Sequence, residues 1–555
     1  MKIVLAEKVS PATLAVLKEE PGWNVVTADE IAKKGPGGLE AELADADALV
    51  VRSAVQVTAK LLESAPKLRL IGRAGVGVDN IDAAAATHKG IVVMNTPGAN
   101  AVAVAELTLG LMVAMARSIP RANATMHAGK WEKKTLQGSE LRNKTFGIVG
   151  LGRIGMEVAR RARSFGMELI GYDPFIAPAV ARENHVTLVP LDEIFKRSDY
   201  LTLHVGLTSQ TEGMINATSL KIMKPGVRII NCARGELIVD EALVEAIKSG
   251  HVGGAALDVF AKEPLKDSPY FELENVFLSP HIAGSTDEAQ EAIGIQLAQQ
   301  VRDYLKLGVV QNAVNVPSLS REEYTEVAPY IEMAERLGHF LSHATNGNLE
   351  SIQLTYAGRI AQGKTELVRN AAICGVLANS EANRINAAAI AQERGIRIQE
   401  EKKESTAGGA GSTLKITLHS AGAGAGTDAS ATATVLHGSS PRLLTYDGID
   451  IEAPLNGTLV TIRNHDVPGV VGRIGTILGE HGINIANFAL GRAADRKAAA
   501  GSQKVPQGQA LAVVQIDARN AAETNAAIEE LRKVEAIASV RLVDLESQAA
   551  ADTEK

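Results

Sequence analysis

Short apolar runs alternate with stretches of helical length along residues 1–98. Runs rich in Val, Ile and Leu predict strands, and the stretch Pro11–Glu19 between two of them predicts a helix. The predicted strands of this region are Lys2–Ala6, Ala48–Val51, Leu68–Gly72 and Ile91–Asn95. Such alternation favours a doubly wound parallel sheet, with helices on both faces.

The same alternation continues between two long helices, predicted at Ala101–Arg117 and Thr286–Leu307. Its predicted strands are Phe146–Val149, Glu168–Tyr172, Tyr200–His204, Val227–Asn231, Gly254–Val259 and Val276–Ser279. Two helices that bracket a unit in this way indicate that the unit is inserted within the first domain. We therefore expect a discontinuous, flavodoxin-like first domain at 1–98 plus 287–316, and a second doubly wound domain at 99–286.

The pattern changes after Pro317. Apolar residues at helical spacing from Tyr324 to Leu341 predict one long helix. The runs that follow predict strands, at Ser351–Tyr356, Leu414–Leu418, Ala431–Leu436 and Arg442–Tyr446. Two segments rich in Gly, Ala and Ser predict turns or mobile loops, at Ser405–Ser412 and Ser420–Ser430. We expect a third domain of α+β type at 317–453.

The last part of the chain predicts the order βαββαβ, which is a small ferredoxin-like layout. The predicted strands are Gly457–Arg463, Ile483–Arg492, Ala510–Asp517 and Ser539–Leu545. The predicted helices are Gly469–His481 and Ala521–Val534. We expect a fourth domain at 454–548 and a disordered tail at 549–555.

Composition excludes several classes of function. The chain has 555 residues, 46% of them hydrophobic but only 3% aromatic, so aliphatic side chains must build its cores. A net charge of −7 gives no general attraction to nucleic acid or to an anionic membrane, and we expect neither partner. Two cysteines make no disulfide framework, and no apolar run reaches the roughly 18 residues of a membrane span. We expect a cytoplasmic protein.

The most informative motif is Gly150-Leu151-Gly152-Arg153-Ile154-Gly155, between a predicted strand and a helix expected at Met156–Gly166. This order is typical of a dinucleotide-binding (Rossmann) fold. Gly150 permits a tight turn, Gly152 lets the backbone approach a pyrophosphate, and Gly155 lets helix and strand pack closely. The helix N-terminus would offer free N–H groups and partial positive charge to the phosphates.

Asp173 ends the next strand, about twenty residues beyond the glycine turn. An acid at that place hydrogen-bonds the adenosine ribose, and its charge repels a 2′-phosphate. The sequence therefore predicts NAD as the cofactor in preference to NADP.

Three polar clusters follow, each at the C-terminal end of a predicted parallel strand, which is where open α/β sheets bind ligands. One residue in each suits the oxidation of a carbinol. His281 can take the hydroxyl proton, because imidazole titrates near physiological pH. Glu263 can orient that imidazole, and Arg234 offers a planar fork for a substrate carboxylate. Each residue alone also has a purely structural explanation: His281 as a core histidine, Glu263 as a loop acid and Arg234 as a helix cap. The occurrence of all three at strand ends of one nucleotide-binding fold favours catalysis.

The chain resembles the D-2-hydroxyacid dehydrogenase family, and within it the long D-3-phosphoglycerate dehydrogenases. The resemblance rests on the glycine turn, the three clusters and two further motifs, Arg73–Asn80 and Asn95–Asn100. It implies NAD-dependent oxidation of 3-phospho-D-glycerate to 3-phosphohydroxypyruvate, the first step of L-serine biosynthesis. It also implies that Arg234 binds the substrate, Glu263 orients the histidine and His281 is the acid/base.

The same resemblance assigns the ligand-binding residues and implies no metal. NAD would contact residues of the turn and of the strand ends, namely Gly150, Gly152, Arg153, Ile154, Gly155, Asp173, Val76, Val205, Cys232, Ala233, Arg234, Asp258, His281 and Gly284. The substrate would contact loops of the first domain, at Arg52, Ser53, Gly75 and Asn100. Lys133 and Lys134 either enter the cleft of a neighbouring subunit or form a solvated basic turn.

By resemblance, the third domain is the intervening, anion-binding domain of the long enzymes, and the fourth is an ACT domain, a small-ligand regulatory module. Two ACT domains side by side would bind L-serine at Asp466 and Asn484, and their pairing implies a homo-oligomer, by resemblance a tetramer. Asn464 stands where relatives often carry a larger residue, and the segment 492–509 is long and polar, so regulation by serine stays open. The connection through Asn456 and Gly457 is the expected hinge.

Two other functions also stay open. A reductase of 2-oxoglutarate would use the same three catalytic residues. An NAD-sensing scaffold, such as the corepressors built on this fold, would use the fold without the chemistry. The ACT-like module and the lack of a basic partner arm favour the enzyme.

Overall fold

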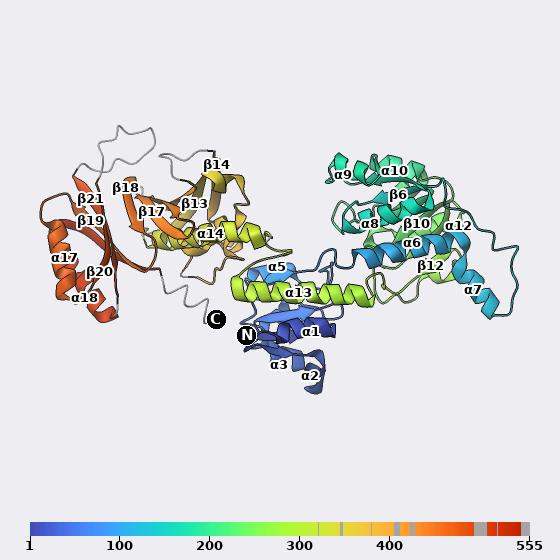
Figure 1. The fold of residues 1–555 in the computed structure, drawn as a ribbon, viewed down its shortest axis with the longest axis horizontal. Coiled ribbons are helices and arrows are strands. Elements are labelled where there is room, and N and C mark those ends of the chain that lie inside the picture. Colours follow the sequence, from blue (N-terminus) through green and yellow to red (C-terminus); the bar gives the residue numbers. More distant parts are fainter. Residues whose placement is uncertain are drawn as a thin grey trace.

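The computed structural model describes residues 1–319, 321–343, 348–378, 380–404, 411–421, 428–492, 508–518 and 520–545. The described residues form four sheets with their helices (Figure 1). The expected fold class is confirmed, because two parallel α/β sheets are followed by a mixed sheet and an antiparallel sheet. The tail beyond residue 548 and most of the segment 492–509 lie outside the described residues, as does much of the two segments rich in Gly, Ala and Ser.

The first sheet is parallel, with strand order β2-β1-β3-β4-β5. Its strands are β1 (Lys2–Leu5), β2 (Asn24–Val26), β3 (Ala48–Val51), β4 (Leu70–Arg73) and β5 (Val92–Met94). Its helices are α1 (Pro11–Lys18), α2 (Ala28–Lys33), α3 (Gly38–Leu43), α4 (Ala59–Glu63) and α5 (Ala83–His88). The helix α13 (Asp287–Leu307) returns to this sheet, and its Leu297 and Val301 are buried in one core with Leu70 and Val92 (Figure 1).

The second sheet is also parallel, with strand order β12-β11-β10-β9-β6-β7-β8. Its strands are β6 (Thr145–Val149), β7 (Glu168–Tyr172), β8 (Thr187–Leu188), β9 (Tyr200–Leu203), β10 (Val227–Asn231), β11 (Val252–Leu257) and β12 (Val276–Leu278). Its helices are α6 (Ala101–Arg117), α7 (Ile119–His127), α8 (Arg153–Ala162), α9 (Pro178–Glu183), α10 (Leu191–Arg197), α11 (Ala217–Ile222) and α12 (Asp240–Lys248). Short 3₁₀ turns lie at η1 (Arg163–Phe165), η2 (Gly235–Leu237) and η3 (Pro269–Glu272).

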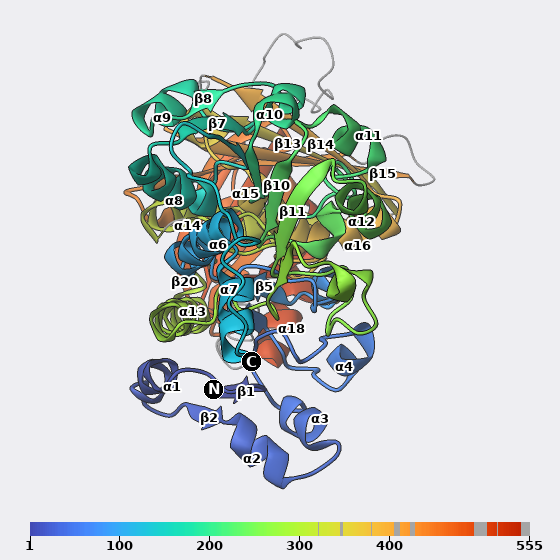
Figure 2. The ribbon, with the colours of Figure 1, turned by 90° about the vertical axis from the view of Figure 1, so that its right-hand side faces the viewer.

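Helices cover both faces of this second sheet, with α6 and α8 on one face and α10, α11 and α12 on the other (Figure 2). The chain order changes direction at β6, which pairs with β7 on one side and with β9 on the other. A switch of this kind opens a crevice at the carboxyl ends of the strands. The fold thereby brings the glycine turn and all three polar clusters to one edge.

The third sheet has strand order β14-β13-β15-β16-β17-β18, and only its pair β13–β14 is parallel among the described strands. Its strands are β13 (Asn348–Ala357), β14 (Arg397–Lys403), β15 (Thr413–Ala421), β16 (Ala429–Leu436), β17 (Ser440–Tyr446) and β18 (Ile449–Pro454). Its helical elements are α14 (Arg321–Ser342), η4 (Gly358–Gln362), α15 (Glu366–Val376) and α16 (Ala387–Glu393).

The fourth sheet is antiparallel, with strand order β20-β21-β19-β22, and it has the predicted βαββαβ layout. Its strands are β19 (Thr458–His465), β20 (Ile485–Arg492), β21 (Gln509–Ile516) and β22 (Ile537–Asp544), and its helices are α17 (Val470–Glu480) and α18 (Ala521–Leu531). The face without helices is buried against the third sheet, since Leu459, Leu511 and Val543 share one core with Ile451 and Leu455. A swing at the expected hinge would therefore expose apolar surface.

No single helix in the described part of the chain is long and apolar enough to cross a membrane. The helices α6 and α7 meet the criteria of length and composition only together, as a pair bent by 65°. The residues Ala105 and Met112 of α6 are completely buried against the second sheet.

Candidate active site

The glycine turn leaves room for a phosphate at the start of α8. A Cβ at Gly150 would lie 2.5 Å from the carbonyl oxygen of His204, and a Cβ at Gly155 would lie 2.0 Å from the carbonyl oxygen of Gly150. These two positions therefore accept only glycine. The N-cap residue Gly152 has open space where its Cβ would be. A pyrophosphate can approach the backbone N–H groups there, which is what a bound dinucleotide requires.

Asp173 lies beside this turn, directly after β7. Its Oδ2 accepts a hydrogen bond from the backbone N–H of Leu151 at 2.8 Å, and its Oδ1 accepts one from the N–H of Phe175 at 2.8 Å. These bonds hold the carboxylate at the end of β7, where a dinucleotide places its adenosine ribose.

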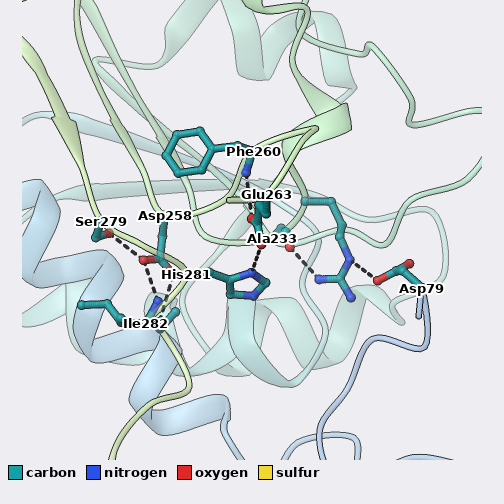
Figure 3. Close-up of polar contacts among 10 residues, drawn as sticks. Asp79, Ala233, Asp258, Phe260, Glu263, Ser279, His281 and Ile282 are labelled. Carbon is teal, nitrogen blue, oxygen red and sulfur yellow. Dashed lines mark hydrogen bonds and ion pairs between the residues drawn. The ribbon is translucent and has the colours of Figure 1, made fainter. Parts of the chain in front are cut away.

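His281 and Glu263 form a hydrogen-bonded pair (Figure 3). The distance from His281 Nδ1 to Glu263 Oε2 is 2.8 Å, and the other carboxylate oxygen of Glu263 accepts the backbone N–H of Phe260 at 3.0 Å. The imidazole is half-exposed, so a ligand can reach its Nε2. An Nδ1–H donated to the carboxylate leaves the lone pair on Nε2, as a general base requires.

The loop that carries His281 is anchored by Asp258, which is completely buried. One oxygen of this carboxylate accepts hydrogen bonds from Ser279 Oγ at 2.6 Å and from the N–H of Ile282 at 3.0 Å, and the other accepts the N–H of Ala283 at 2.9 Å (Figure 3). His281 itself has a φ of 53°, which is uncommon for a residue with a side chain. Asp258 therefore acts through the loop in this structure, and its contact with a cofactor stays a prediction.

Arg234 follows β10 in a turn shaped by the buried Asn231. The side chain of Asn231 donates to the carbonyl oxygen of Arg234 at 2.7 Å and accepts the N–H of Ala233 at 3.0 Å. The guanidinium of Arg234 donates through Nε to Asp79 Oδ2 at 3.0 Å and through Nη1 to the carbonyl oxygen of Ala233 at 2.6 Å (Figure 3). Since Asp79 lies in the loop between β4 and α5 of the first unit, this ion pair joins the two α/β units.

The predicted substrate residues lie in loops of the first sheet and at the start of α6. Arg52 and Ser53 follow β3, and Arg52 Nη1 donates to the carbonyl oxygen of Lys8 at 3.3 Å. Asn100 is the N-cap residue of α6, and its Oδ1 is buried with no hydrogen-bond partner among the described residues. Asn100 Nδ2 would lie 3.2 Å from a Cβ at Gly284, so these two residues are close neighbours.

Arg73 is a residue that we did not assign from the sequence, although it begins the motif Arg73–Asn80. Its guanidinium lies against Gly75, where a Cβ would come within 1.4 Å of Arg73 Nη1. Its Nε is buried without a hydrogen-bond partner in the described part of the chain. Burial, and then the positive charge of Arg234, lower the pKa of Arg73 to about 10. The arginine in this motif was visible in the sequence, but its proximity to Arg234 was not.

The other predicted cofactor residues surround the same edge. Val205 contacts the glycine turn, since its Cγ1 would lie 2.9 Å from a Cβ at Gly150. Arg153 donates a hydrogen bond to the carbonyl oxygen of Pro97 in the first unit. The Cys232 thiol has its pKa raised to about 12 by burial, so it stays protonated. Two further residues belong to neighbouring apolar clusters, Ile154 and Ala233.

Val76 occupies the loop that follows Arg73, and its carbonyl oxygen accepts a hydrogen bond from Asn95 Nδ2 at 2.5 Å. Lys133 and Lys134 are exposed beyond α7, next to Trp131, whose relative exposure is 79%. No group of three or more His, Cys, Asp or Glu residues that could hold a metal ion occurs within the described ranges.

Family models match three parts of the chain. They are the D-isomer specific 2-hydroxyacid dehydrogenase NAD binding domain over residues 109–283, the D-3-phosphoglycerate dehydrogenase intervening domain over 326–446 and the ACT domain over 458–536. The D-3-phosphoglycerate dehydrogenase of Methanocaldococcus jannaschii is 38% identical over 549 residues, which cover 98% of this chain and 100% of that protein. The chain belongs to the D-3-phosphoglycerate dehydrogenase family.

Other members and more distant structures agree. The Bacillus subtilis member is 37% identical over 529 residues, covering 93% of this chain and 95% of that protein. An NAD-dependent formate dehydrogenase from Staphylococcus aureus in complex with NAD covers 57% of this chain at 29% identity, with all of that chain matched and a TM-score of 0.50. A D-lactate dehydrogenase from Aquifex aeolicus complexed with NAD and lactic acid gives the same coverage, identity and TM-score. This family member therefore carries an NAD-binding dehydrogenase unit and an ACT domain.

The two predicted regulatory residues lie at opposite ends of β20. Asp466 follows β19, and its carboxylate pairs with Arg492 Nε at 3.1 Å, at the end of β20. Asn484 precedes β20, and its Nδ2 donates to Asp517 Oδ2 at 2.8 Å. Because β20 has 8 residues, the two ends are about 25 Å apart. One ACT domain of this family member therefore does not bring Asp466 and Asn484 together.

Asp173→Asn should relax the choice between the two cofactors. The amide has one oxygen and so keeps only one of the two hydrogen bonds from the N–H groups of Leu151 and Phe175, and it no longer repels a 2′-phosphate. We expect the ratio of Kd for NADP⁺ to Kd for NAD⁺, measured by calorimetry, to fall by about 10-fold or more. Asp192→Asn, a substitution on the exposed side of α10, is the matched control and should leave the ratio unchanged. An unchanged ratio in Asp173→Asn would show that Asp173 does not face the ribose.

Proposed function

We propose that this protein catalyses the NAD-dependent oxidation of 3-phospho-D-glycerate to 3-phosphohydroxypyruvate, which is the first step of L-serine biosynthesis. Relatives that match almost the whole chain carry the name D-3-phosphoglycerate dehydrogenase. The observation that carries the proposal is the hydrogen-bonded pair His281–Glu263, together with the guanidinium groups of Arg73 and Arg234 on the loop of Gly75 and Gly77.

Three arginines form a site for a substrate with more than one negative charge. The guanidinium of Arg73 lies against Gly75 and that of Arg234 lies against Gly77 in the same loop, so the two cations repel one another, and burial and then the charge of Arg234 lower the pKa of Arg73. The charge of Arg52 acts in the same direction more weakly, while Asp79 and Glu7 raise the pKa of Arg73. A ligand with a carboxylate at one end and a phosphate at the other would relieve that repulsion. A planar guanidinium also binds either group through two parallel hydrogen bonds. A simple hydroxy acid, with one carboxylate, would leave part of the positive charge uncompensated.

The proposed chemistry assigns one role to each catalytic side chain. Arg234 binds the carboxylate and, with its charge, polarises the carbonyl that forms at C2. His281 takes the hydroxyl proton of C2 at Nε2, and Glu263 stabilises the imidazolium through Nδ1–H. NAD⁺, when bound, accepts the hydride that leaves C2. The anchored loop of Asp258 keeps the imidazole in position throughout.

A substrate panel tests this proposal. Purified protein should reduce NAD⁺ with 3-phosphoglycerate as the substrate. In the reverse direction, kcat/KM for 3-phosphohydroxypyruvate should exceed that for 2-oxoglutarate by about 10-fold or more, because the phosphate adds charge-assisted hydrogen bonds. A preference for 2-oxoglutarate would identify a reductase of that acid. Binding of NAD without turnover of any hydroxy acid would identify a sensing scaffold.

His281→Ala should lower kcat by about 10²–10⁴-fold, because it removes the general base. The affinity for NADH, followed by fluorescence, should change little. His251→Ala is the matched control, since the ring of that histidine contacts only the carbonyl oxygen of Leu220 among the described hydrogen bonds, at the other end of the sheet. A kcat within a few-fold of wild type would contradict the role of His281.

We further propose that L-serine binds where two ACT domains pair in a homo-oligomer. A head-to-tail pair would place Asp466 of one chain beside Asn484 of the other, which one domain alone does not do. Two features bear on the affinity. The carboxylate of Asp466 already has the cation of Arg492 as a partner, and the buried Asn464 donates to the carbonyl oxygen of His465 at 2.8 Å.

Subunit mixing tests this composite site. Serine binding, measured by calorimetry, should be lost in Asp466→Ala and in Asn484→Ala. An equimolar mixture of the two variants, after subunit exchange, should regain binding, because each mixed pair contains one junction with both native residues. Wild-type affinity in either single variant would place the site elsewhere, and a wild type that binds no serine would rule out this regulation.

The remaining organisation follows the same proposal. We propose domain limits of 1–98 with 287–316, 99–286, 317–453 and 454–548, supported by the return of α13 to the first sheet and by family-model matches within these limits. We also propose a cytoplasmic homotetramer, which fits the two free cysteines, both buried. The exposed Trp131, Lys133 and Lys134 are the proposed contribution of each subunit to the cleft of its neighbour.

A further inference from the structure

In the loop Arg52–Val55, which follows β3, Glu7 accepts the backbone N–H groups of three of the four residues. One oxygen of Glu7 accepts the N–H of Arg52 at 2.8 Å and that of Val55 at 3.1 Å, and the other accepts the N–H of Ala54 at 3.2 Å. Glu7 comes directly after β1, the neighbour of β3 in the sheet. Glu7 thereby leaves the side chains of this loop and the N–H of Ser53 for a substrate phosphate, and the position of the loop decides where these groups lie.

Asn80 holds the same loop from the other side. Its Nδ2 donates to the carbonyl oxygen of Val55 at 2.7 Å and to that of Arg52 at 3.1 Å. Both hydrogens of the amide are thus used on the two ends of the loop. The backbone of Asn80 is fixed as well, since its carbonyl oxygen accepts the N–H of Val57 at 2.8 Å.

Asp79, the preceding residue, holds Arg234. Its carboxylate accepts Arg234 Nε at 3.0 Å (Figure 3). The same guanidinium lies against Gly77, where a Cβ would come within 1.8 Å of Arg234 Nη2. The Asp79 side chain is 64% exposed, so the pair adds little to folding stability. Its consequence is geometric. Asp79 engages Nε and the carbonyl oxygen of Ala233 takes one hydrogen of Nη1, so Nη2 and the second Nη1 hydrogen are left to face a ligand.

We propose that Asp79 and Asn80 are positioning residues that set the spacing between Arg234 and the loop Arg52–Val55. Adjacent Cα atoms are about 3.8 Å apart, so two consecutive residues form a short, stiff link between the group that takes the carboxylate and the loop that takes the phosphate. The link selects for an acid whose phosphate lies a fixed distance from its carboxylate. This inference rests on the proposed function and extends it to substrate specificity.

Steady-state kinetics with NADH and two oxo acids tests the link. 3-Phosphohydroxypyruvate and hydroxypyruvate share the carboxylate and differ in the phosphate. Asn80→Ala should raise KM for the phosphorylated acid by about 10-fold or more, while its KM for hydroxypyruvate and both kcat values stay within about twofold. Asp79→Asn should lower kcat/KM for both acids by about 10-fold or more, because it loosens Arg234. Asp29→Asn, an exposed substitution of the same type in the same unit, should change neither.

Each outcome separates the link from a general loss of structure and from the proposed function. NADH affinity, measured by fluorescence, reports on the integrity of the second unit, and Asn80→Ser is the milder variant if Asn80→Ala fails to fold. Equal changes in KM for both acids in Asn80→Ala, or an unchanged kcat/KM in Asp79→Asn, would overturn the inference. In that case a wild type active on 3-phosphohydroxypyruvate would still uphold the proposed function. A wild type inactive on that acid would overturn both.

Discussion

Positive charge is concentrated where the two α/β units meet, and the rest of the site is arranged around it. Arg73 is half-buried, its buried Nε has no hydrogen-bond partner among the described residues, and the positive charges of Arg234 and Arg52 act on it. Such repulsion costs free energy unless an anion enters. The carboxylates of Asp79 and Glu7 offset part of this charge, since both raise the pKa of Arg73, while Glu7 also accepts backbone N–H groups and Asp79 accepts Nε of Arg234. The positive charge that remains in the fold favours the binding of a substrate with two anionic groups.

The catalytic pair is held by a different kind of constraint. His281 has a left-handed backbone conformation, which persists in folded proteins only where the surroundings over-determine it. Here the buried Asp258 accepts three hydrogen bonds from the loop on both sides of His281, and Glu263 fixes the ring. The imidazole of His281 is therefore held rigidly. Arg234, in contrast, belongs to the second unit and pairs with Asp79 of the first, so its position depends on how the two units are arranged. Closure of the units can thus adjust the carboxylate site without disturbing the proton acceptor.

Sequence patterns correctly predicted the elements whose hydrophobic periodicity or glycine content is compatible with only one type of local structure. The elements β3, β7, β10 and α6 occupy their predicted residues, and Glu263 with His281 was foreseen from chemistry alone. Other elements have patterns that mislead: β14 (Arg397–Lys403) is a polar, mostly exposed edge strand, and α15 is buried on all sides and so lacks an apolar stripe. Contacts such as Asn80 with Arg52 depend on how neighbouring loops approach, which local patterns do not encode. The separation of Asp466 from Asn484 follows from strand direction, which the predicted βαββαβ order already contained.

The central claim is that one substrate bridges the two units, with its carboxylate on Arg234 and its phosphate at Arg52 and Arg73. A crystal structure of the full chain with NADH and 3-phosphoglycerate bound together tests it most directly. The account predicts both guanidinium contacts within hydrogen-bond distance, with the C2 hydroxyl about 3 Å from His281 Nε2. A bound substrate with its phosphate on Arg234, or with Arg73 still lacking an anionic partner, would contradict it.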